Sequence, residues 1–198
     1  MSKLVLVLCF LGGWSAGTAQ TSNPQTPTPA PVPPSATASP TMPPPARPGD
    51  VDTIDHILAA IYDVISGPAG APRDWDRFRS LFYPGARLIP SNRNDKGVVA
   101  ARVLSPEDYV SRGKGAFANQ GFFETSIANR IEVWDHMAHV WSTYESRHAQ
   151  GEKPFARGIN SFQLLNDGNR WWILSVYWEA EDKDHPLPEK YLKSAPSN

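Results

Sequence analysis

The chain has 198 residues, the length of one ordinary domain with extensions. Its 19 basic and 20 acidic residues are interspersed and give a formal net charge of −1, so we expect neither nucleic acid nor an anionic membrane as a partner. The single cysteine, Cys9, lies in an N-terminal apolar segment, so a mature chain without that segment has no disulfide and no cysteine metal site.

The first residues have the features of an export signal. Lys3 supplies a positive charge, a short apolar run follows from Leu4 to Gly12, and Gly17-Thr18-Ala19 places small residues before a cleavage site. We expect residues 1–19 to be removed and the mature chain to be periplasmic or secreted. The apolar run is shorter than the about 20 residues that span a bilayer, so no membrane insertion is expected after cleavage.

Residues 20–49 consist largely of Pro, Thr, Ser and Ala. This composition cannot build a hydrophobic core, so we expect a disordered linker, either a passive spacer or a stalk with a role of its own. The folded domain should then span residues 50–182. A polar tail over residues 183–198 follows, with Tyr191 and Leu192 as its expected anchors.

Two amphipathic helices open the domain. The first follows Asp52 as its cap, and its apolar residues recur at spacings of three and four: Ile54, Leu58, Ile61 and Ile65. Tyr62 flanks this stripe. A shorter helix follows Asp74, and a third, weakened by two glycines, begins at Ser105-Pro106. Short strands are expected between the second and third helices, over residues 86–89 and 97–103.

From residue 123 the apolar pattern changes to a period of two, which is typical of strands. The residues expected on one face are Phe123, Thr125, Ile127, Asn129, Ile131 and Val133, with Glu124, Arg130 and Glu132 among those on the other face. A long strand over residues 138–148 and a final hairpin follow. Helices followed by long antiparallel strands predict an α+β fold.

The final hairpin surrounds Asp167-Gly168, a dipeptide typical of two-residue turns in which both residues have positive φ. Counting outward from this turn places Phe162 opposite Ile173, and Asn160 opposite Ser175, on one face. The opposite face is also largely apolar, and a second copy of the chain is the expected cover. The residues assigned to this homodimer face are Ile159, Trp172, Leu174, Val176 and Trp178.

Three stretches carry a resemblance to a known family: residues 74–86, with Asp74-Trp75-Asp76-Arg77-Phe78, residues 138–145, and Asp167-Gly168 followed by Arg170-Trp171-Trp172-Ile173. They resemble the nuclear transport factor 2-like superfamily, which includes ketosteroid isomerase, scytalone dehydratase and polyketide cyclases. The resemblance covers about residues 51–181. It implies a cone-shaped roll, cystatin-like, with helices packed on a strongly curved mixed or antiparallel sheet, and a pocket between the two layers.

The hairpin register combined with this fold predicts a pocket for a small, uncharged or weakly polar organic ligand. Its expected lining is Tyr62, Tyr144, Asn160, Phe162, Trp171, Ser175 and Tyr177. The alternative is a cofactor-independent dehydratase, isomerase or cyclase in the same pocket, which needs an acid or base beside the tyrosines. No carboxylate is convincingly aimed inward on this register, and His148 and Glu179 are weak candidates. Neither a metal nor a cofactor is expected, and a binding or scaffold role is favoured.

Overall fold

The computed structural model describes residues 42–194, so the predicted export signal and most of the predicted linker lie outside the described residues. Within this range the elements are, in order, η1 (Pro48–Asp50), α1 (Ile54–Ile65), α2 (Trp75–Ser80), β1 (Phe82–Arg93), β2 (Val99–Ala101), α3 (Pro106–Asn119), β3 (Phe123–Trp134), β4 (Met137–Arg147), β5 (Ala156–Asn166), β6 (Trp171–Ala180) and η2 (Glu189–Tyr191). The strands form one six-stranded sheet in the order β2-β1-β6-β5-β4-β3. β1 and β6 are parallel and the other neighbours antiparallel, which confirms the predicted α+β class with a mixed sheet.

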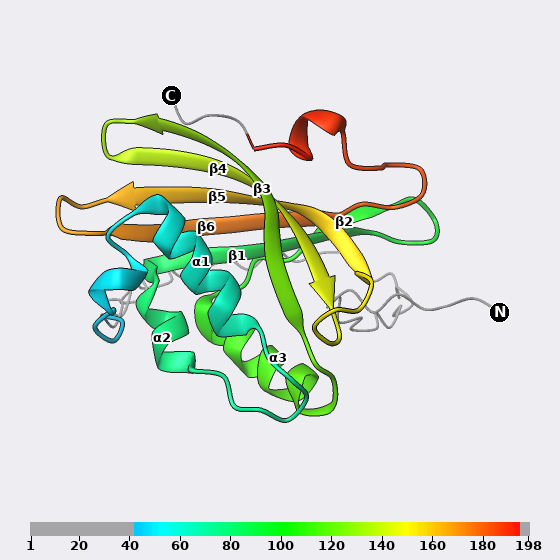
Figure 1. Ribbon diagram of the computed structural model, residues 1–198, viewed down its shortest axis with the longest axis horizontal. Helices are drawn as coiled ribbons and strands as arrows, with labels where there is room; N and C mark the ends of the chain where they lie inside the picture. The colour runs from blue at the N-terminus through cyan, green and yellow to red at the C-terminus, as the bar shows by residue number, and fades with distance from the viewer. Residues whose placement is uncertain (1–41, 195–198) are drawn as a thin grey trace, which may run out of the picture.

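The helices lie on one face of a strongly curved sheet (Figure 1). The core between these layers includes Ile57, Phe78 and Ile173, each 0% exposed. α1 is capped by Thr53, whose hydroxyl accepts from the backbone N–H of His56 at 3.1 Å, and not by Asp52 as expected. α3 spans 14 residues and is longer than its two glycines suggested, because Ser105 and Asp108 form a reciprocal capping box at its start.

The folded part of the chain begins before residue 50. Ala46 packs against the core, and Arg47 forms an ion pair with Asp74 at 2.8 Å. Asp50 is buried and accepts two hydrogen bonds from the Arg77 guanidinium, at 2.8 and 2.9 Å. The boundary between linker and domain therefore lies several residues before the one predicted from composition.

The turn of the final hairpin differs from the predicted two-residue turn. Asn166 pairs with Trp171, which leaves a four-residue loop over residues 167–170. Gly168 has a φ of 92°, whereas Asp167 has no positive φ, so the type I′ condition is not met. The Asp167 carboxylate instead accepts from the backbone N–H groups of Asn169 and Arg170, at 2.9 and 3.0 Å. An Asp that bonds the backbone in this way stabilises a longer turn.

Two β-bulges change the face of the sheet that residues of β3 and β6 occupy. The pairing of β5 with β6 shifts between Leu164–Ile173 and Gln163–Ser175, which leaves Leu174 unpaired. The pairing of β3 with β4 shifts between Ser126–Tyr144 and Ala128–Thr143, which leaves Ile127 unpaired and 40% exposed. An extra residue on one strand moves every residue beyond it to the opposite face.

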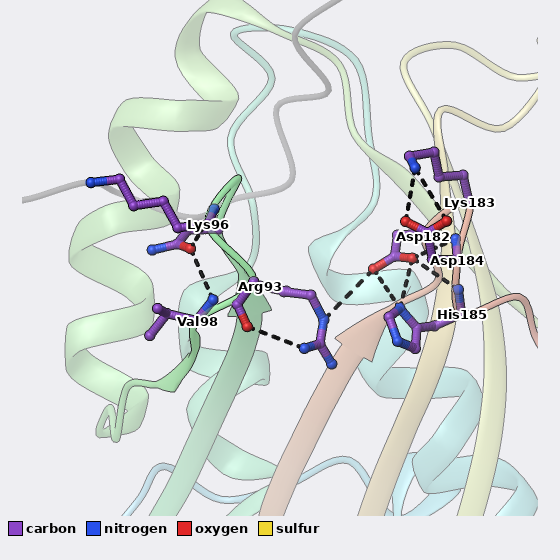
Figure 2. Close-up of polar contacts among 9 residues, drawn as sticks. Arg93, Lys96, Val98, Asp182, Lys183, Asp184 and His185 are labelled. Carbon is purple, nitrogen blue, oxygen red and sulfur yellow. Dashed lines mark hydrogen bonds and ion pairs between the residues drawn. The ribbon is translucent and has the colours of Figure 1, made fainter.

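The C-terminal segment covers part of the outer face of the sheet. Tyr191 packs on Trp141 with ring centroids 5.6 Å apart, and its carbonyl accepts from the Thr143 hydroxyl at 2.5 Å. Figure 2 shows the turn that leads into this segment, where the Asp182 carboxylate contacts His185 Nδ1 at 2.8 Å and Arg93 Nε at 4.0 Å. No helix of residues 42–194 is long and apolar enough to cross a membrane.

Candidate functional site

A cavity of about 80 Å³ lies between the helices and the concave face of the sheet. It has room for several water molecules or a small organic molecule. Most of its wall is aromatic or aliphatic, with residues from α1, α2 and α3, from the strands β1, β4, β5 and β6, and from the segments before β3 and β5. These residues are Ile61, Tyr62, Ile65, Phe78, Phe82, Leu88, Tyr109, Phe122, Tyr144, Phe155, Ala156, Phe162, Val176 and Trp178. The polar residues in the lining are Glu124, Ser146 and Asn160.

The polar end of the cavity is built around the Glu124 carboxylate. Ser146, directly opposite on β4, donates its hydroxyl to Glu124 Oε2 at 2.8 Å, and Asn160 Nδ2 lies 3.4 Å from Glu124 Oε1. Burial raises the pKa of Glu124 to about 7, against the opposing effect of these two hydrogen bonds. Glu124 therefore changes its charge near neutral pH, where an ordinary glutamate is fully ionised.

A chain of hydrogen bonds leads from the same end of the cavity to α1 and β3. Asn160 Nδ2 donates to the Tyr62 hydroxyl at 3.0 Å, which lies 2.6 Å from the Ser142 hydroxyl. Ser142 donates to the Ser126 hydroxyl at 3.1 Å, and Ser126 donates to the side-chain amide oxygen of Asn129, Oδ1, at 2.8 Å. Because this last oxygen can only accept, each hydroxyl in the chain must donate toward it. The single proton of Tyr62 is thus held by Ser142, and the Tyr62 oxygen acts as an acceptor.

Tyr109 brings a hydroxyl from α3 into the cavity wall. Its ring stacks on Phe78 with centroids 5.1 Å apart. Burial and the nearby Glu124 charge raise the pKa of Tyr109, and the same two causes raise the pKa of Tyr62. Both phenols therefore remain protonated at neutral pH, and Tyr109 can donate to a bound molecule.

A second, more open groove lies beside the cavity, between α1 and β3. Tyr62 and Glu124 line both spaces, so these two side chains separate the enclosed cavity from the groove. This position explains why Glu124 as a whole keeps partial exposure while its carboxylate oxygens are held by Ser146 and Asn160. The far rim of the groove is formed by Arg147 and the turn over residues 150–152.

The structure brings together four of the residues assigned to the pocket from the sequence: Tyr62, Tyr144, Asn160 and Phe162. The assignments of Ser175 and Tyr177 were wrong, because the bulge at Leu174 turns both to the outer face, where Tyr177 is 41% exposed. Trp171 is buried in the core and does not line the cavity.

The bulge also changes the predicted homodimer face. Val176 and Trp178 line the cavity, so their assignment to the outer face was wrong. Trp172 is on the outer face but is only 8% exposed, because the Arg170 guanidinium lies 3.6 Å from its ring centre and Tyr83 packs against its edge. Ile159 pairs with Glu179 on the outer face and is half-buried.

Neither weak catalytic candidate lies in the cavity lining. His148 stacks on the outer side of this region against Phe155, with ring centroids 4.0 Å apart, and its Nε2 contacts Gln120 at 3.1 Å. Glu179 lies opposite Ile159, on the outer face beyond the bulge. The expectation that no carboxylate points inward was therefore wrong as well, because the inward carboxylate is Glu124.

The cavity-lining residues that sequence reasoning missed include Glu124, Tyr109 and Trp178. The period-two pattern placed Glu124 outward because it was counted continuously through Ile127, where the strand has its bulge. One signal was present in the sequence. Glu124 directly follows Phe122 and Phe123, and an acid beside adjacent aromatics at a strand start is unusual for a solvated face.

No family model matches the chain, and neither does any curated protein. A protein of unknown function with a cystatin-like fold from Nostoc punctiforme is 11% identical, with a TM-score of 0.49, over 66% of this chain and 90% of that one. An NTF-2-like protein of unknown function from Silicibacter pomeroyi is 14% identical, with a TM-score of 0.42, over 65% of this chain and 99% of that one. A protein with a cystatin-like fold from Caulobacter vibrioides is 12% identical, with a TM-score of 0.47, over 66% of this chain and 89% of that one. These three solved structures are described as NTF-2-like or cystatin-like.

Proposed function

We propose that the domain binds a small organic molecule in the cavity between the helices and the sheet. The observation that carries this proposal is the convergence of Glu124, Ser146 and Asn160 at one end of an otherwise apolar, aromatic cavity. Small-molecule sites are typically built this way, with an apolar wall for affinity and a few polar groups for orientation. The apolar part of the ligand would contact the ring of Trp178, and its polar group would face Glu124.

Thermal unfolding in the presence of small organic molecules tests this proposal. A ligand that binds the folded chain alone raises the free energy of unfolding by about 2.7 kcal/mol at 100 times its Kd. The Ala156→Phe variant places a ring in the cavity wall and should abolish the rise. Ala100→Phe adds the same side chain on exposed β2 and should leave it unchanged. A stabilisation that survives Ala156→Phe would place the ligand elsewhere.

A second candidate function is acid–base catalysis in the same cavity. The observation that favours it is the Glu124 pKa of about 7, which suits a group that takes up and releases a proton at neutral pH. Glu124 would act as the base, and the Tyr109 hydroxyl would donate to an oxygen that gains negative charge. Such a site could support an isomerase, a dehydratase or a cyclase without a cofactor.

Hydrogen exchange at carbon distinguishes catalysis from binding. The protein would be incubated in D₂O with small ketones that bind, and deuterium incorporation next to the carbonyl followed by NMR. An enzyme of this kind should show exchange that Glu124→Gln removes while binding persists. Binding with no exchange above the rate of buffer leaves the cavity as a binding site alone.

We also propose that the chain is exported. Lys3, the apolar run that follows it and the small residues up to Ala19 support removal of residues 1–19, and the Pro-rich stretch after them would act as a linker. Mass spectrometry of the protein recovered from its source cells would test this. A mature N-terminus at Gln20 is expected, and an intact Met1 in the folded, localised protein would contradict it.

We further propose a homodimer through the outer face of the sheet. With Trp172 covered by Arg170 and Trp141 covered by Tyr191, the part of this face left for a second copy is centred on β5 and β6. Its apolar contacts would come from Ile159 and Tyr177.

A further inference from the structure

We infer that the ligand of the cavity is a small protonated amine, held by the Glu124 carboxylate inside the aromatic wall. This inference rests on the proposed binding function and specifies the chemical class of the ligand. The sequence suggested an uncharged or weakly polar ligand, from the aromatic residues and the few polar groups assigned to the pocket. Glu124 adds a carboxylate to that lining and changes the expected charge of the ligand.

The partners of Glu124 differ from those of three other shielded carboxylates, which are paired with arginines. Asp50, Glu145 and Glu181 each form an ion pair with an arginine: Arg77, Arg147 and Arg157, respectively. Glu124 receives hydrogen bonds from the neutral donors Ser146 and Asn160, and no lysine or arginine of the described residues is among the groups that act on its pKa. A buried carboxylate without a cation is costly, and a positively charged ligand would remove that cost.

The aromatic part of the cavity lining suits the same ligand. Aromatic side chains dominate it, among them Tyr109, Phe122, Phe155 and Trp178. The faces of aromatic rings attract cations, and ring-lined cavities are a recurrent way to bind ammonium groups. The carboxylate and the rings, which line one cavity, thus favour the same charge.

Glu124 is the cavity-lining group that can change this charge balance near neutral pH. Tyr62 from α1 and Tyr109 from α3 have raised pKa values and stay neutral. The other ionisable groups around it are outside the cavity lining: Asp55, Asp63, Arg147 and Glu152 along the groove, and His148 behind Phe155. Because alkylamines, like lysine, titrate near pH 10, the amine keeps its charge while Glu124 ionises.

Calorimetric titration with matched pairs of molecules tests the inference. Tert-butylamine and cyclohexylamine would be compared with tert-butanol and cyclohexanol, which have the same shape and no charge. The amines should bind at least tenfold tighter than the alcohols at pH 8. With half-ionisation of Glu124 at about pH 7, amine affinity should fall about tenfold from pH 8 to pH 6.

Two variants assign the effect to Glu124. Glu124→Gln should reduce amine affinity at pH 8 at least tenfold and remove its pH dependence. Glu132→Gln removes a carboxylate from an exposed position of the same strand and should change neither. Alcohols that bind as tightly as the amines, or a pH dependence that persists in Glu124→Gln, would overturn the inference and leave the binding function standing. If neither class binds, the proposed binding function fails together with the inference.

Discussion

The Tyr62 hydroxyl lies 2.6 Å from the Ser142 hydroxyl and connects the middle of α1 to the centre of β4. Both side chains are buried, with 6% and 0% exposure, so neither has water as an alternative partner. Since Tyr62 also accepts from Asn160, one phenol satisfies groups on two strands and closes the polar end of the cavity. The position of α1 over the sheet depends on this contact as well as on apolar packing.

Tyr62→Phe should destabilise the domain by about 1–3 kcal/mol, because it leaves buried polar groups of Ser142 and Asn160 without a partner. Urea unfolding followed by fluorescence measures the change in the free energy of unfolding. Tyr83→Phe is the matched control, since Tyr83 is 42% exposed on the outer face. Equal stability of the two variants would show that the network contributes little.

Glu124→Gln should make the domain more stable at pH 8 and have little effect at pH 4. The folded-state pKa of Glu124, about 7, is above the ordinary value of about 4.5, so the native state binds this proton more tightly than the unfolded chain does. The wild-type stability from this group is therefore fully present below pH 4.5 and is lost as the pH rises to about 7. The loss is up to about 3 kcal/mol, since a difference of one in pKa corresponds to about 1.4 kcal/mol.

Acidic groups whose pKa is lowered in the folded protein lose their stabilising effect as the pH falls, which is opposite to Glu124. The quantity to measure is therefore the difference in the free energy of unfolding between Glu124→Gln and the wild type. The Arg77 hydrogen bonds lower the pKa of Asp50, for example, and the stability from that pair is lost as the pH falls. Subtracting the wild-type free energy of unfolding from that of Glu124→Gln at each pH cancels such contributions. The difference should rise from pH 4.5 to pH 7 and then stay constant. A difference that does not change with pH would mean that Glu124 titrates normally.

Arg73→Met should destabilise the domain by about 3 kcal/mol, because the guanidinium donates to backbone carbonyls where α1 ends. It bonds Ile65 at 3.0 Å, Gly67 at 2.7 Å and Ala71 at 2.8 Å, and it is 8% exposed. The Ile65 and Ala71 carbonyls would lose the guanidinium as donor, whereas the Gly67 carbonyl also accepts from the Phe122 N–H. Thermal unfolding measures the effect, with Arg47→Met as the control. The Arg47 side chain is 63% exposed in a single ion pair, so its loss should cost no more than about 1 kcal/mol.

Local sequence signals were sufficient for the class of the fold. The spacing of Ile54, Leu58, Ile61 and Ile65 predicted α1, and the capping residues Asp74 and Ser105 marked the next two helices. β4 and β5 pair along their length without a register shift, and Ser142 lies opposite Asn160. These features depend on residues close in sequence, or on strands without irregularities.

The composition of the site could not be predicted in full, because two bulges decide it. A register counted from one end of a strand is correct only up to the first unpaired residue. Ile127 and Leu174 look like ordinary strand residues, yet they determine that Glu124, Val176 and Trp178 line the cavity. A bulge is favoured by the curvature of the whole sheet, and that curvature is not encoded at the bulge alone.

The last prediction concerns the outer face of the sheet. Sedimentation velocity of the unmodified protein should show a dimer, and replacing Ile159 and Tyr177 together with Lys should give a folded monomer, because charges at the centre of the contact repel. Val176 is unsuitable for this test, since it is 6% exposed and lines the cavity, so a lysine there would disrupt the core. Val133→Lys, a change of an exposed side chain near the tip of β3, is the control and should leave the dimer intact. A monomeric unmodified protein would remove the dimer proposal and leave the cavity as a site within one chain.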